Sequence, residues 1–150
     1  MGNDEPKTVT GGCQCGAVRY RAVIDLSKVH YCHCRMCQRA SGNAFALLVP
    51  ALRDDVQWTG EPASFRSSTV ASRGFCRDCG TPLSFAYDGS RWLCVTLGSL
   101  DDPAACAPRI HFGVEAQLPW LHLPDELPRE RTDEARFPGL VNLQRSAPAE

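Results

Sequence analysis

The sequence Cys76-Arg77-Asp78-Cys79-Gly80 and the earlier Cys13-Gln14-Cys15 place four cysteines in two short motifs. A Cys-x-x-Cys motif needs a tight turn, and Gly80 readily takes the left-handed conformation that such a turn demands. On a strand, residues i and i+2 point to the same face about 7 Å apart, so Cys13 and Cys15 can reach one metal. Four thiolates complete a tetrahedral zinc site with Zn–S distances of about 2.3 Å. We therefore predict a structural zinc at Cys13, Cys15, Cys76 and Cys79, which can add on the order of 10 kcal/mol to folding.

The stretch Cys32-His33-Cys34-Arg35-Met36-Cys37 holds three more of the nine cysteines. Structural zinc sites have four protein ligands, whereas catalytic ones have three and an open position. We therefore expect Cys32, Cys34 and Cys37 to bind a second, catalytic zinc, which is the more labile of the two. A closed site is the alternative, with the fourth ligand coming from His30, His33, His111 or Cys106. For the first four cysteines, Cys13, Cys15, Cys76 and Cys79, the alternatives are iron–sulfur ligation and redox-active dithiols.

The remaining candidates are single residues. His111 can serve as a proton shuttle because the ordinary pKa of histidine lies near neutrality, although a lone strand histidine is often structural. His33 lies between two ligands on a strand, so it should point away from the metal. Cys94 is expected in the core as a small apolar residue. Arg35, Arg39, Arg73 and Arg77 flank the motifs, where cations lower thiol pKa values and can hold a substrate carboxylate.

Composition limits the classes of protein that this chain can be. Its 150 residues suggest one domain, and the hydrophobic share of 43% is enough for a core. The formal net charge of −1 gives no electrostatic reason to expect nucleic acid as a partner. There is no apolar run long enough to span a membrane, and the polar N-terminus lacks a signal core. We expect a cytoplasmic protein, in which closely spaced cysteines indicate metal binding or catalysis rather than disulfides.

Short alternating or apolar runs separated by Gly, Pro or Asp predict a mainly β protein. A helical turn is expected between Arg35 and Ser41. We expect a flexible lead over residues 1–10, one zinc domain over 11–128 and an extended or disordered tail over 129–150. The expected strands cover residues 17–24, 29–34, 45–49, 56–59, 63–67, 83–87, 92–97 and 109–114.

Several motifs, in order, resemble one known family. The opening Gly11-Gly12-Cys13-Gln14-Cys15-Gly16, the central stretch from Cys32 to Phe45 and the later Arg73-Gly74-Phe75-Cys76-Arg77-Asp78-Cys79-Gly80 are similar to the glutathione-dependent formaldehyde-activating enzymes, also called the centromere protein V family. Gly98–Pro103, Pro108–Phe112 and Pro119-Trp120 extend the resemblance, which covers about residues 11–128. It implies a β-tent fold of short antiparallel sheets around a structural zinc, and the same division of the seven cysteines between a structural and a catalytic zinc. It also implies a carbon–sulfur lyase that joins glutathione and formaldehyde.

The resulting hypothesis is an enzyme that joins or cleaves a small thiol and an aldehyde. Metal coordination favours the thiolate, which is the nucleophilic form. A non-catalytic zinc module for protein or nucleic acid is one alternative. A methionine sulfoxide reductase is another, but it needs a separate low-pKa cysteine, and only Cys94 and Cys106 remain for that role.

Overall fold

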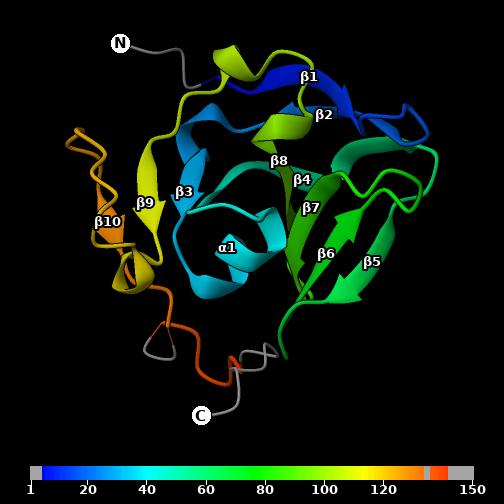
Figure 1. Ribbon diagram of the computed structural model, residues 1–150. Helices are drawn as coiled ribbons and strands as arrows, with labels where there is room; N and C mark the ends of the chain where they lie inside the picture. The colour runs from blue at the N-terminus through cyan, green and yellow to red at the C-terminus, as the bar shows by residue number, and fades with distance from the viewer. Residues whose placement is uncertain (1–4, 134–135, 142–150) are drawn as a thin grey trace.

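The computed structural model describes residues 5–133 and 136–141. Figure 1 shows a strongly curved sheet that wraps around one short helix, α1. The prediction of a mainly β fold built from antiparallel strands is confirmed, with two parallel pairs added, β3 with β9 and β9 with β10. The strands are β1 (Lys7–Gly12), β2 (Arg19–Ile24), β3 (His30–Cys32), β4 (Ala46–Thr59), β5 (Ala63–Arg66), β6 (Ala71–Phe75), β7 (Pro82–Tyr87), β8 (Trp92–Thr96), β9 (Ile110–Phe112) and β10 (Arg129–Glu130). The helices are α1 (Arg35–Ser41) and the single 3-10 turns η1 (Leu26–Lys28), η2 (Leu97–Ser99), η3 (Pro103–Ala105) and η4 (Val114–Ala116).

Strand β4 holds the two halves of the sheet together. The main strand order is β10-β9-β3-β4-β8-β7-β6-β5, and the β1–β2 hairpin joins β4 through β2. Residues 46–48 of β4 pair with β3, and residues 48–52 pair with β8. Its C-terminal part pairs with β2, with a shift in register between Ala22 and Ile24 that marks a bulge or irregularity. The helix α1 therefore lies between two groups of strands that diverge from β4 (Figure 1).

The sequence prediction of two strands, 45–49 and 56–59, is wrong because β4 is continuous through Pro50. Proline lacks the amide hydrogen that a sheet interior normally uses. Its carbonyl group still accepts a hydrogen bond from the Asp25 amide at 2.9 Å. The register shift lies at residues 51–56 of β4, where the pairing partner changes from β8 to β2. Such a shift bends a strand.

Both ends of the chain differ from the expected boundaries. Residues 7–10, expected in a flexible lead, form most of β1 and pair with residues 21–24 of β2. After Pro128, the chain adds β10 parallel to β9, and turns follow at residues 136–140. Residues 136–141 reach the turn after β5, where Thr69 and Val141 exchange hydrogen bonds. The rest of the expected tail, residues 142–150, lies outside the described residues.

The larger core lies between the β1–β2 hairpin, β4 and β8. Its fully buried members include Ile24, Val49, Val95 and Leu83, and Cys13 and Cys76 belong to the same cluster. A smaller cluster contains Cys32 and Cys37 with two residues of β4, and it lies beside α1. Each group of metal-binding candidates is therefore attached to its own apolar cluster.

Two candidate metal centres and a cavity

The first group, named here the four-cysteine site, consists of Cys13, Cys15, Cys76 and Cys79. All four sulfur atoms lie within 4.8 Å of one another. The Sγ atoms of Cys13 and Cys15 are 3.6 Å apart, and those of Cys15 and Cys76 are 3.7 Å apart. A tetrahedron with Zn–S bonds of about 2.3 Å has sulfur–sulfur edges of roughly 3.8 Å. The spacing and the donor set therefore fit one zinc ion.

Two turns deliver these sulfurs, and both use glycine at a left-handed position. Gly80 follows Cys79 with φ +78°, and Gly16 follows Cys15 with φ +82°. The turn at Gly80 is closed by its amide, which donates to the Cys76 carbonyl at 2.8 Å. The role predicted for Gly80 is thus confirmed. The prediction that Cys13 and Cys15 lie on a strand is wrong, because both lie in the turn between β1 and β2.

Thr81 connects the two turns of the four-cysteine site. Its hydroxyl oxygen accepts from the Gln14 amide at 3.1 Å and lies 3.2 Å from the Cys79 sulfur. Hydrogen bonds from the Thr81 hydroxyl and backbone lower the pKa of Cys79 to about 5. A thiolate is therefore favoured at this position before any metal binds, as a metal ligand requires.

The second group, named here the three-cysteine site, consists of Cys32, Cys34 and Cys37. Their sulfur atoms also lie within 4.8 Å of one another, and the Cys32 and Cys34 sulfurs are 3.5 Å apart. No histidine or acidic side chain among the described residues joins this group as a fourth ligand. The donor set and spacing fit three positions of a zinc tetrahedron.

The helix α1 explains the spacing of this group. Cys32 ends β3, Cys34 caps the helix N-terminus, and the Cys34 sulfur accepts from the Cys37 amide at 3.4 Å. Gly113 allows the neighbouring loop to approach closely, because a Cβ atom there would lie 2.6 Å from the Cys34 amide nitrogen. Gln38 joins the same two segments by donating to the carbonyl groups of His33 and Ala116.

One of the flanking arginines, Arg73 of β6, has a direct role at the three-cysteine site. It is only 7% exposed, and its guanidinium donates to the Cys37 sulfur at 3.3 Å and to the Ser67 hydroxyl at 3.0 Å. The same group lies over the Phe85 ring. Hydrogen bonds from Cys32 and Cys34, and then the positive charge of Arg73, hold the pKa of Cys37 well below its usual range. Cys37 is therefore the thiol of this group that most readily becomes a thiolate.

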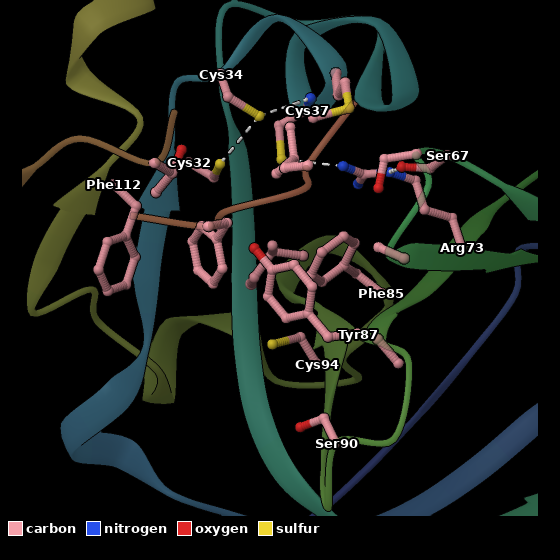
Figure 2. A pocket seen from close by; sticks show the side chains of 18 of the residues that line it. Cys32, Cys34, Cys37, Ser67, Arg73, Phe85, Tyr87, Ser90, Cys94 and Phe112 are labelled. Carbon is pink, nitrogen blue, oxygen red and sulfur yellow. Dashed lines mark hydrogen bonds between the residues drawn. The ribbon is translucent and has the colours of Figure 1, made fainter. Parts of the chain in front are cut away.

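All three cysteines of this group line a cavity of about 260 Å³. Figure 2 shows their sulfurs at one end of it, with Phe85 and Tyr87 below them and Phe112 to the side, near Cys32. Burial, followed by the nearby thiols, raises the pKa of Tyr87 far above its usual value, so this hydroxyl keeps its proton. Residues 132, 136, 137 and 140 of the tail complete the wall. Sequence reasoning missed Tyr87 and the tail, since no cysteine motif or local spacing pointed to either.

Cys94 also lines this cavity, so the expectation that it is wholly a core residue needs correction. On β8 the buried side chains are Leu93 and Val95, and Cys94 alternates with them toward the cavity. Burial raises the pKa of the Cys94 thiol to about 12, so it is a poor nucleophile. Cys106 is fully buried in the larger core. Neither cysteine has the reactive setting that a sulfoxide reductase needs.

His111 occupies a different place from the one expected of a proton shuttle. It is fully buried and is absent from the cavity wall. Its Nε2–H donates to Asp125 at 3.0 Å, its ring stacks on Tyr31, and its Nδ1 is hydrogen-bonded to His33 Nε2 at 2.8 Å. His33 points away from the sulfurs, as predicted, and burial lowers its pKa to about 4. The pair therefore joins the residue after β3 to β9, and neither histidine lines the cavity.

The comparisons with known proteins agree with this geometry. The family model described as "Glutathione-dependent formaldehyde-activating enzyme" matches residues 8–116. The chain belongs to this family. The range matched by the glutathione-dependent formaldehyde-activating family includes all seven clustered cysteines and Arg73 but ends before the tail residues of the cavity wall.

Two relatives add detail. An uncharacterized lyase of Schizosaccharomyces pombe is 32% identical over 81 residues, which are 54% of this chain and 59% of that protein. The match thus spans less than two thirds of the relative's own length. A Rhodobacter sphaeroides protein of known crystal structure has 19% identity and a TM-score of 0.51, covering 82% of this chain and 99% of that chain. This second likeness shows a shared fold.

In the part of the chain that the structure describes, no helix is both long and apolar enough to cross a membrane.

Proposed function

We propose that the protein is a zinc-dependent carbon–sulfur lyase that joins a small thiol to an aldehyde, or cleaves the product, at the three-cysteine site. The family's description names glutathione and formaldehyde, and the Schizosaccharomyces pombe relative is named as a lyase. The observation that carries the proposal is a set of three clustered thiols that face a cavity, with no fourth ligand among the residues that the structure describes. Zinc bound there would supply a free coordination position and favour the thiolate form of a bound thiol.

The reaction needs no oxidant. The sulfur of the substrate thiolate attacks the carbonyl carbon, a carbon–sulfur bond forms, and the carbonyl π electrons move to oxygen. The proton that left the thiol ends on that oxygen, giving a hydroxyalkyl thioether, and cleavage is the reverse. Zinc with three thiolate ligands is electron-rich, so it suits thiol activation better than carbonyl polarisation.

The residues of this chain take complementary roles in the proposal. The Arg73 guanidinium offsets the negative charge of the three thiolates through Cys37. Tyr87 lines the cavity with a protonated hydroxyl, which can donate a hydrogen bond to the oxygen that gains charge. The half-buried rings of the wall exclude water from the reacting atoms. With His111 enclosed, Tyr87 is the better candidate for proton donation.

Exchange spectroscopy by NMR provides the test, because thiols and formaldehyde also combine without an enzyme. With glutathione, 2-mercaptoethanol or benzyl mercaptan as the thiol, ¹³C-formaldehyde should exchange with its adduct faster when protein is present. Cys34→Ser should return the exchange to the uncatalysed rate while the fold is kept. Tyr87→Phe should slow it by roughly 10²-fold or more, as loss of a proton or hydrogen-bond donor does. A wild-type protein that accelerates the exchange with none of these three thiols would leave a non-catalytic zinc module as the better interpretation.

A further inference from the structure

Beyond the sulfurs, the wall of the cavity is mainly apolar, and five of its side chains are Phe, Tyr or Trp. Phe85 and Tyr87 of β7 meet edge to face with ring centroids 4.9 Å apart. Phe137 of the tail stacks on Tyr87 at 5.0 Å, and Phe112 of β9 and Trp92 of β8 close other sides. Such walls favour an apolar guest, because water leaves both surfaces when the guest binds.

Charged groups in the wall are already engaged within the protein. Arg73 donates to Cys37 and Ser67, and the Arg136 guanidinium is paired with Glu130 while lying over the Phe112 ring. The wall contains no Asp, Glu or Lys among the described residues. Glutathione carries two carboxylates and one ammonium group, and each would lose water here without an unengaged partner of opposite charge.

The tail limits the size of the guest. It is held across the cavity at Thr69, whose hydroxyl donates to the Gly139 carbonyl and accepts from the Val141 amide, both at 2.9 Å. The cavity that remains is about 260 Å³, below the usual range of ligand pockets, which begins near 300 Å³. A guest of one ring and a short linker suits this volume better than an extended tripeptide.

We infer that the thiol substrate of the three-cysteine site is a compact, uncharged apolar thiol of about the size of benzyl mercaptan, and that Phe137 is a specificity-determining residue for it. This inference rests on the proposed function, since it names the substrate class of the same site. The inferred thiol differs from glutathione, which the family's description names. Part of the cavity wall that favours it comes from tail residues after the range matched by the family, which ends at residue 116.

The test uses the full-length protein loaded with Co²⁺, whose absorption changes when a thiolate enters its coordination sphere. Benzyl mercaptan, 2-mercaptoethanol and glutathione are titrated in turn, with Cys34→Ser as the variant that lacks a complete three-cysteine site. We expect benzyl mercaptan to bind at least tenfold more tightly than either of the other thiols. Glutathione binding as tightly as benzyl mercaptan would overturn the inference but leave the proposed function standing. No spectral change with any thiol would overturn the proposed function itself.

A matched pair of phenylalanine variants tests the wall. Phe137→Ala should weaken the binding of benzyl mercaptan by about tenfold, because an aromatic contact and its buried area are lost. The affinity for 2-mercaptoethanol should change by no more than about twofold. Phe65→Ala is the control, because Phe65 is 46% exposed and lies outside this cavity. Equal weakening of both thiols by Phe137→Ala, or an equal effect of Phe65→Ala, would refute a selective role for Phe137. Circular dichroism of both variants verifies that the fold is retained.

Discussion

The four-cysteine site and the three-cysteine site use the same ligand atom in different surroundings. In the first, two turns converge, Cys15 and Cys79 are exposed, and none of the four sulfurs lines the cavity. In the second, a strand end and a helix N-terminus supply three partly or fully buried sulfurs that face an aromatic cavity. The number of ligands therefore differs with the place of the site. The four-cysteine site has a complete set of ligands and joins distant segments of the chain. The three-cysteine site lacks a fourth ligand and faces a space that a small molecule can enter.

Strand β6 physically connects the two sites. Its inward-facing Arg73 donates to Cys37, and Cys76 follows directly after the strand ends. A disturbance of the four-cysteine site should thus reach the three-cysteine site through β6. The reverse should be weaker, since α1 and β3 bind no sulfur of the first site. This asymmetry orders the following predictions.

The largest effect is expected from Cys76→Ser. The variant opens the four-cysteine site, where bound zinc contributes on the order of 10 kcal/mol, comparable to the whole stability of a typical domain. We expect loss of soluble folded protein, measured by far-UV circular dichroism and metal content. Cys106→Ala is the matched control: it removes another fully buried thiol of the same core cluster but no ligand. If Cys76→Ser folds as well as this control does, the four-cysteine site is not what holds the domain together.

Cys34→Ser should separate catalysis from folding. The three-cysteine site closes no long loop, so its loss should leave the secondary structure unchanged and about one metal per chain. Turnover should fall to the uncatalysed rate, because the thiol no longer has a complete site. Metal analysis, circular dichroism and the exchange measurement should be made on one preparation. Unfolding of this variant would mean that both sites are structural and that the contrast between them is wrong.

The seven cysteines could be divided into two sites from sequence because metal-ligand spacing is local: the members of each motif lie within six residues of one another. The mainly β fold was equally accessible from short alternating runs. Strand β6, with the sequence Ala71-Ser72-Arg73-Gly74-Phe75, was missed because it contains no β-branched residue and one glycine. The place of Arg73 depends on that strand's register, so its contact with Cys37 could not be predicted. The cavity wall was hidden for the same reason, since Tyr87, Phe112 and Phe137 meet only in the folded chain.

Arg73→Met should have an intermediate effect, confined to the three-cysteine site. Because Arg73 is one of the groups that lower the pKa of Cys37, its removal should raise that pKa. Metal binding requires the thiolate, so the pH midpoint for Co²⁺ binding at this site should move upward, and affinity at neutral pH should fall by roughly 10- to 100-fold. Arg73→Lys should give a smaller shift, because charge is kept while the fork of donors is lost.

The control for this variant lies on the other turn. Arg77→Met removes an exposed arginine that lies between Cys76 and Cys79. Unlike Arg73, Arg77 makes no hydrogen bond to a sulfur of the described residues. It should leave the pH midpoint of the three-cysteine site unchanged. Equal shifts for Arg73→Met and Arg77→Met would show that general positive charge, rather than the contact with Cys37, controls this site.

The smallest effect is expected from Thr69→Val. This variant tests the tail segment that covers the cavity of the three-cysteine site, a feature that the four-cysteine site lacks. The substitution keeps the shape of the side chain but removes the hydroxyl that holds Gly139 and Val141. Each lost hydrogen bond is worth at most about 1 kcal/mol net, and these are exposed, so global stability should change little. The amide of Val141 should exchange with deuterium faster, and benzyl mercaptan should bind about two- to threefold more weakly. Thr8→Val, at an exposed position on β1, should change neither quantity. If amide exchange rises while thiol affinity stays fixed, the tail is mobile but does not shape the cavity, and the selectivity then depends on the rings of β7, β8 and β9 alone.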